Sequence, residues 1–306
     1  MQSSTVSSPR TATGAGALMI GGAAVLWGTV GVTTQALYDT SATNALSIGF
    51  FRLALSAPVL LLACWLFVGR AMFQIERRDW WLILALGALT ATYQVCLFSA
   101  IRFVGVSIAV VITLCVAPVF VALASVRLFG EQLTRWTLLA LGLALIGTLL
   151  LSGGGAGLNA TTGATITGVA LALGSALGYG CIALIGRVLA PRYHPLQPIA
   201  FGFTAGAIIL LPIALAQGLV TMYAPLGWAL LLYMGLLPTA VAYVLFLFGM
   251  RAVSATTASV ITLVEPLTAA LLAWWLFDER LGPAGLLGGA LLLGAIALLY
   301  RNEERR

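Results

Sequence analysis

Two side chains of opposite charge interrupt long apolar runs of the sequence, Glu265 and Arg52. Glu265 lies near the middle of the run 256–276, and Arg52 lies about 10 Å from one end of the run 45–68 at about 1.5 Å per helical residue. An ionised carboxylate in hydrocarbon costs about 2.5–3.5 kcal/mol, so Glu265 should face a cavity, find a partner or be protonated. It could bind a substrate ammonium group, carry a coupling proton or make a structural hydrogen bond. Arg52 could bind a substrate carboxylate, pair with Glu265 or extend to the lipid headgroups.

Pro118 and Pro266 occupy equivalent positions in two apolar runs and should interrupt both helices. Proline removes one helical hydrogen bond and frees the carbonyl four residues earlier, here that of Leu114 or Thr262. Broken helices at matching depths in two halves of a chain are typical of transport sites, although a kink can also serve packing alone. We therefore treat Pro118 and Pro266 as candidate helix breaks or gates, and we expect both runs to bend.

Aromatic side chains and one amide also fall at the middle of apolar runs. They are Trp27, Tyr93, Gln94, Tyr179 and Tyr243. Aromatic walls with a few polar tips suit an amphipathic metabolite that carries a ring or an apolar side chain, although each of these residues can equally belong to a packed core. Together with Glu265, Arg52 and Thr262 they make up the predicted substrate cavity.

Other chemistries lack the residues they require. The sequence contains no lysine, which excludes a Walker A nucleotide site and a Schiff-base cofactor. Its four cysteines lie in apolar runs, and its one histidine, His194, lies in a polar loop, so we expect no metal site, no cofactor and no catalytic residue. An intramembrane enzyme would need a nucleophile with a base, or paired acids, and the apolar runs provide one acid.

The composition indicates whether the helices that carry these residues lie in water or in lipid. Of 306 residues, 61% are hydrophobic and 8% are charged, against roughly 25% charged in soluble domains. A helix of about 20 apolar residues spans a bilayer. Runs near this length occupy 17–37, 45–68, 80–101, 107–127, 136–152, 165–187, 197–217, 228–249, 256–276 and 284–300. We therefore predict an all-α integral membrane protein with ten transmembrane helices, preceded by a disordered tail at 1–15 and followed by a tail at 301–306.

The arginines indicate the orientation of the chain. With ten spans and both termini in the cytoplasm, twelve of the 15 arginines fall on the cytoplasmic side, two fall outside, and Arg52 lies within a span. Positively charged residues concentrate on the cytoplasmic side of membrane proteins. The net charge of +6 is therefore explained by topology and by anionic lipid, and it does not require nucleic acid as a partner.

The chain also resembles itself. A shift of 148 positions aligns 80–151 with 228–299 without a gap, and it pairs LFGEQL at 128–133 with LFDERL at 276–281. Less common residues coincide as well, among them Trp80 with Trp228 and Glu131 with Glu279. We infer a duplicated five-span unit, with one repeat at 16–152 and the other at 165–300. Because five is odd, the second copy must insert upside down, which gives an inverted repeat with a site near the midplane.

The order and spacing of short motifs resemble a known family. These motifs are Trp27-Gly28, Phe51-Arg52, Pro118 followed by LFGEQL, and Val264-Glu265-Pro266 followed by the run to Leu281. They are similar to the drug/metabolite transporter superfamily, to its ten-helix EamA-type exporters, and within these most of all to the YddG-type amino-acid exporters of bacterial inner membranes. The resemblance implies export of small metabolites through a cavity between the repeats. One departure is Ala117, which stands where the second half has Glu265.

The expected function is secondary transport of a small amphipathic molecule. The resemblance favours export of neutral or aromatic amino acids across the bacterial inner membrane by alternating access. A passive channel and an exporter of other small drugs or metabolites remain open alternatives, and an intramembrane enzyme is a distant third. The sequence leaves open the exact substrate, proton coupling and the oligomeric state.

Overall fold

Helices make up the structure, a computed structural model that describes residues 9–129, 135–153, 162–253, 258, 261–262, 264–279 and 282–303. No strand occurs among these described residues. The elements are α1 (Pro9–Thr40), α2 (Ala45–Val68), the 3-10 turn η1 (Gly69–Phe73), α3 (Trp80–Phe129), α4 (Arg135–Gly153), α5 (Thr162–Leu189), α6 (Leu196–Ala216), α7 (Pro225–Gly235), the π-helical segment η2 (Leu236–Val241), α8 (Ala242–Gly249), α10 (Val264–Phe277) and α11 (Pro283–Glu303).

The surface of these helices is apolar. Six helical stretches in the described part of the chain are long and apolar enough to cross a membrane, and two shorter apolar helices accompany them. Large hydrophobic side chains point outward, for example Trp81 at 76% exposure and Leu66 at 70%. In water such a surface would be unfavourable, so the fold fits a multi-pass membrane protein.

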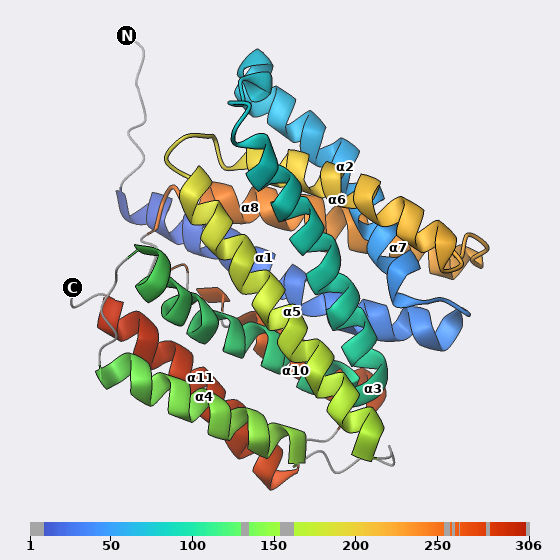
Figure 1. Cartoon of the computed structure of the whole chain (residues 1–306), viewed down its shortest axis with the longest axis vertical. Helices are drawn as coiled ribbons and strands as arrows, with labels where there is room; N and C mark the ends of the chain where they lie inside the picture. Colours follow the sequence, from blue (N-terminus) through green and yellow to red (C-terminus); the bar gives the residue numbers. More distant parts are fainter. Residues whose placement is uncertain are drawn as a thin grey trace.

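The helix α3 is long enough for two membrane crossings, and it turns back at Gly105. Gly105 has φ of 79°, a left-handed conformation that glycine adopts without strain. Figure 1 shows the first half of α3 running to this turn and the second half leaving in another direction. The two predicted runs at 80–101 and 107–127 therefore correspond to the two arms of one interrupted helix.

A carboxylate from the far end of the sequence holds this turn. Glu279, just after α10, accepts hydrogen bonds from the backbone N–H groups of Val106 at 2.7 Å and Ser107 at 2.9 Å. These groups begin the second arm of α3, where a helix leaves its first N–H groups without intrahelical partners. A Cβ atom added to Gly105 would lie 2.7 Å from Oε1 of Glu279, so this position also requires glycine for space.

The helices pack around α1 (Figure 1). On one side α2 packs against α6, and on the other α4 packs against α11. The central helix α1 contacts α8, α10 and the arms of α3, while α5 lies along α3. Glycines allow close contact: a Cβ added to Gly87 of α3 would lie 2.6 Å from the carbonyl oxygen of Gly202 in α6.

Polar contacts join the loops at the arginine-rich end of the bundle. Asp79, whose side chain is 3% exposed, accepts hydrogen bonds from Arg192 and Tyr193, each at 2.7 Å. These hydrogen bonds, that from Tyr193 above all, hold the pKa of Asp79 below its usual value. Nε2 of His194 lies 2.9 Å from Nη2 of Arg251, and burial together with this arginine lowers the pKa of the imidazole.

Two expectations about the elements differ from the structure. The helix α1 begins at Pro9, so 9–15, part of the tail that the sequence predicts as disordered, is helical. A small residue such as Ala15 extends the helix at little conformational cost. The predicted run 228–249 is helical throughout, but η2 interrupts it with a π-helical segment at its centre.

Candidate functional site

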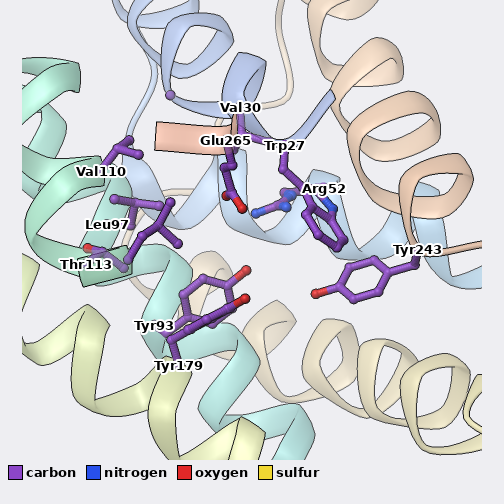
Figure 2. Close-up of a pocket in the computed structure, with 12 residues that line it drawn as sticks. Trp27, Val30, Arg52, Tyr93, Leu97, Val110, Thr113, Tyr179, Tyr243 and Glu265 are labelled. Carbon is purple, nitrogen blue, oxygen red and sulfur yellow. The ribbon is translucent and has the colours of Figure 1, made fainter. Parts of the chain in front are cut away.

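A cavity lies among the helices where the two charged residues of the apolar runs meet. Six elements contribute to it: α1, α2, α3, α5, α8 and α10. Its lining residues are Trp27, Val30, Gly31, Arg52, Tyr93, Leu97, Val110, Thr113, Leu114, Tyr179, Tyr243 and Glu265. Figure 2 shows the guanidinium of Arg52 and the carboxylate of Glu265 pointing into the same space.

Arg52 is buried, at 5% exposure, and its guanidinium is held from two directions. Its Nε donates a hydrogen bond to Oγ1 of Thr239 at 2.9 Å, and its Cζ lies 5.9 Å from the centre of the Phe98 ring. Thr239 is itself completely buried, and its hydroxyl donates to the carbonyl oxygen of Met234 at 2.7 Å. Because arginine keeps its charge in proteins, these contacts position a permanent cation at the cavity.

Glu265 lies in α10, next to the first described residue of that helix, Val264. The position of α10 depends on Gly28 of α1. A Cβ added to Gly28 would lie 2.6 Å from Cβ of Thr268 and 2.8 Å from the carbonyl oxygen of Glu265. Glycine at this position therefore lets α10 approach α1 closely enough for the carboxylate to reach the cavity.

Arg52 and Glu265 do not form an ion pair. Both belong to the described residues, and no hydrogen bond or salt bridge joins them there. A guanidinium and a carboxyl group that line one cavity without a hydrogen bond between them can each receive a polar group of a bound molecule.

Aromatic rings form the remaining walls. Trp27 packs edge-on against Tyr243 at 5.4 Å between ring centroids, and Tyr93 packs against Tyr179 at 5.7 Å. Figure 2 shows Tyr93 and Tyr179 together on one side of the cavity and Tyr243 on another. Nε1 of Trp27 is buried and has no hydrogen-bond partner among the residues that the structure describes. The walls can therefore hold an apolar group and offer a free N–H donor beside it.

Comparison with known proteins decides the family. The model of the EamA-like transporter family matches residues 14–153 and, a second time, residues 166–301. This chain belongs to the EamA-like transporter family. The EamA assignment makes the protein a membrane transporter and not an enzyme, in agreement with the prediction from its sequence.

Individual EamA relatives and a solved structure agree with this assignment. The chain is 32% identical over 284 residues to "Uncharacterized transporter YwfM" of Bacillus subtilis, covering 93% of each protein. It is 28% identical over 194 residues to "Probable terminal-alkyne amino-acid exporter" of Streptantibioticus cattleyicolor, covering 62% of this chain and 63% of the exporter. A solved structure titled "Crystal structure of protein" aligns with a TM-score of 0.67 at 21% identity, covering 94% of this chain and 98% of the other, and so shares its fold.

The structure brings together six of the eight residues that the sequence assigns to the cavity of this EamA protein. They are Glu265, Arg52, Trp27, Tyr93, Tyr179 and Tyr243. Gln94 is not among the lining residues: it is completely buried, and its Nε2 donates to the carbonyl oxygen of Gly49 in α2 at 3.1 Å. Thr262 is also absent from the lining.

The two candidate helix breaks have different surroundings. In α3 the backbone leaves helical angles at Gly105, and the helix continues through Pro118. Leu114, whose carbonyl Pro118 leaves without its usual partner, lines the cavity. Pro266 lies in α10, and residues 261–262 before it are helical as well. Whether either proline acts as a gate stays a prediction.

Sequence reasoning missed Thr239, which contacts the guanidinium of Arg52. Proline precedes it near the centre of an apolar run, and that feature could have marked the segment as irregular. In the run 228–249 the sequence analysis singled out Tyr243 for the cavity and not the segment around Thr239. The apolar lining residues of α1 and α3 carried no signal that separates them from ordinary core residues.

Proposed function

We propose that the protein is a secondary transporter that exports neutral or aromatic amino acids across the bacterial inner membrane by alternating access. The observation that carries the proposal is the pair of opposite charges, Arg52 and Glu265, in one cavity with aromatic walls. A guanidinium presents paired N–H donors that match a carboxylate, and a carboxylate accepts from an ammonium group. The aromatic walls then face the side chain of the bound amino acid.

The substrate class has separate support from one relative. The Streptantibioticus cattleyicolor protein is named a probable amino-acid exporter. Its similarity extends over part of each chain, so we carry over the class of substrate and not its terminal alkyne. Amino acids share the ammonium and the carboxylate, which are the groups that Glu265 and Arg52 would bind.

The proposed architecture is ten spans in two inverted repeats. Helix pairing supports it, because α2 packs on α6 and α4 packs on α11. In a five-plus-five repeat, the two helices of each pair hold the same position in their own halves of the chain. Likewise α1 contacts α8 and α10, as α5 contacts the two arms of α3. The separate family matches to 14–153 and 166–301 agree with a duplication. The substrate cavity would then lie between the repeats, near the midplane.

The proposed orientation places both termini in the cytoplasm. Its support is the arginine distribution of the sequence, together with the contacts of Arg192 and Arg251 at one end of the bundle. Positively charged loops remain on the cytoplasmic side during insertion.

Counterflow into proteoliposomes tests the proposal. Vesicles preloaded with unlabelled phenylalanine should take up labelled phenylalanine with a saturable rate, and other neutral amino acids should compete. We expect Glu265→Gln and Arg52→Gln each to lower this rate by tenfold or more, because each removes a charge that binds substrate. Arg102→Gln, which removes an exposed arginine, should keep the wild-type rate.

Each other outcome contradicts a distinct part of the proposal. Flux that rises linearly with concentration and is not competed would indicate a channel. Saturable transport of other solutes without amino-acid uptake would refute the substrate class. Wild-type rates in Glu265→Gln would remove Glu265 from the mechanism, and parallel assays with an imposed pH gradient would separate uniport from proton antiport.

A further inference from the structure

The π-helical segment η2 places a hydroxyl group in contact with Arg52. A π-helix contains an extra residue relative to an α-helix, costs stability, and occurs frequently at functional sites. Pro238 lies inside this segment and has no N–H to donate. Thr239 follows it, and the Thr239 hydroxyl donates to the carbonyl oxygen of Met234, five residues earlier, at 2.7 Å.

This bond fixes the role of the Thr239 hydroxyl toward Arg52. A hydroxyl has one proton to donate, and here Met234 receives it. The remaining lone pairs of Oγ1 accept from Nε of Arg52 at 2.9 Å. Since Thr239 is completely buried, water does not compete for this contact. The hydroxyl is therefore a fixed acceptor for Arg52.

The contact determines which edge of the guanidinium stays available. A guanidinium can bind a carboxylate through its Nε edge or through its two terminal nitrogens. Thr239 occupies Nε, and the Phe98 ring lies 5.9 Å from Cζ. The terminal nitrogens are left facing the cavity (Figure 2).

We propose that Thr239 is a positioning residue for substrate recognition, which holds Arg52 so that its terminal nitrogens bind the carboxylate of the substrate end-on. The proposal rests on the proposed function, because it requires Arg52 to meet a substrate carboxylate. Without the hydroxyl, Nε is a buried donor without a partner, and the guanidinium turns away from the cavity to satisfy it. The affinity for carboxylate-bearing molecules then falls, and the affinity for molecules without a carboxylate does not.

Thr239→Val and Thr239→Ser form a matched pair for the test. Valine keeps the shape of threonine and lacks the hydroxyl, whereas serine keeps the hydroxyl. In proteoliposome counterflow, Thr239→Val should raise the KM for phenylalanine roughly tenfold, the worth of one hydrogen bond to a charged group. Thr239→Ser should stay within about twofold of wild type. The inhibition constant of phenethylamine, which lacks the carboxylate, should be the same in all three proteins.

The pair of ligands separates positioning from a general structural role. Equal losses for phenylalanine and phenethylamine in Thr239→Val would overturn the proposal, as would an unchanged KM for phenylalanine. If the valine variant does not fold, Thr239→Ala removes the same hydroxyl without adding a methyl group, and the same results are expected of it.

The failure of the proposed function has a different signature. Two results would refute both the proposed function and the role of Thr239. One is that wild-type vesicles take up no phenylalanine. The other is that Arg52→Gln prefers phenylalanine to phenethylamine as strongly as wild type does. Loss of that preference in Arg52→Gln, with a wild-type KM in Thr239→Val, would refute the role of Thr239 alone.

Discussion

The Glu279 carboxylate should be a main determinant of the stability of the α3 turn. It caps the second arm of α3 through the N–H groups of Val106 and Ser107, which are both nearly inaccessible to solvent. Replacement by alanine leaves both donors without a partner. Replacement by glutamine keeps one neutral acceptor oxygen and removes the charge.

The size of the effect follows from this geometry. A buried donor left without a partner costs about 1–3 kcal/mol, and a carboxylate at a helix N-terminus adds about 0.3–1 kcal/mol. Glu279→Ala removes two such bonds, so we expect a loss of about 4 kcal/mol. Glu279→Gln should lose about 2 kcal/mol, since one bond persists in weaker form.

Thermal unfolding in detergent measures this loss. Cys64 and Cys115 are completely buried, so a thiol-reactive dye reports their exposure as the protein unfolds. At roughly 2–4 °C per kcal/mol, the midpoint of Glu279→Gln should fall by roughly 4–8 °C. The matched control is Glu76→Gln, which removes an acid from an exposed ion pair with Arg78 and should change the midpoint by less than about 2 °C.

A double-mutant cycle identifies the contact. Gly105→Ala introduces a Cβ 2.7 Å from Oε1 of Glu279 at a positive φ, so it should destabilise by displacing the carboxylate and by backbone strain. Combined with Glu279→Ala, its cost should shrink, because the carboxylate it displaces is already absent. Strict additivity, or a midpoint in Glu279→Gln equal to that of Glu76→Gln, would refute the capping role.

Three further predictions concern packing, pH and energetics. Gly87→Ala should lower the unfolding midpoint by several degrees, because its Cβ would lie 2.6 Å from the Gly202 carbonyl oxygen, whereas Gly142→Ala meets open space and should not lower it. Burial and Arg251 lower the pKa of His194 in the folded protein, so folding favours its neutral form. The neutral imidazole therefore contributes fully to stability above the pKa of histidine in the unfolded chain, about 6.5, and this contribution is lost as the pH falls toward the lower pKa of the folded protein. The midpoint of wild type should therefore drop between about pH 6.5 and 5 by more than that of His194→Gln. A zwitterion carries no net charge, so in uniport a membrane potential set with potassium and valinomycin should not drive phenylalanine accumulation. Antiport against one proton moves one charge, and a potential of 100 mV would then give roughly fifty-fold accumulation.

Local sequence determines much of this fold, because the hydropathy of each run fixes where a helix can lie. The same local reading located Arg52 and Glu265 at mid-depth, and the structure places them in one cavity although 213 positions separate them. In hydrocarbon a charged side chain needs a partner, a cavity or access to the headgroups, and convergence of Arg52 with Glu265 was one of these alternatives. The tyrosines followed the same depth argument.

Features that depend on tertiary contacts were not accessible in this way. Gln94 was assigned to the cavity as the neighbour of Tyr93, but consecutive helical residues point about 100° apart, and Gln94 contacts α2 instead. The π-helix η2 has the hydropathy of an ordinary span, since one additional residue in a turn leaves composition unchanged. The contact of Thr239 with Arg52 joins two helices that no local pattern relates.

The charge balance of the cavity explains why Arg52 and Glu265 would occur together in a transporter of zwitterions. One charge alone at mid-depth carries the full cost of desolvation, and an opposite charge in the same low-dielectric space reduces it. Direct contact would reduce it further but would leave neither group free to recognise a ligand. Thr239 holds Arg52 on one side, and the packing of α10 against Gly28 places Glu265, so the guanidinium and the carboxyl group both face the cavity. An amino acid satisfies both charges and adds none, whereas an organic acid or an amine satisfies one and brings a net charge, so both should bind more weakly.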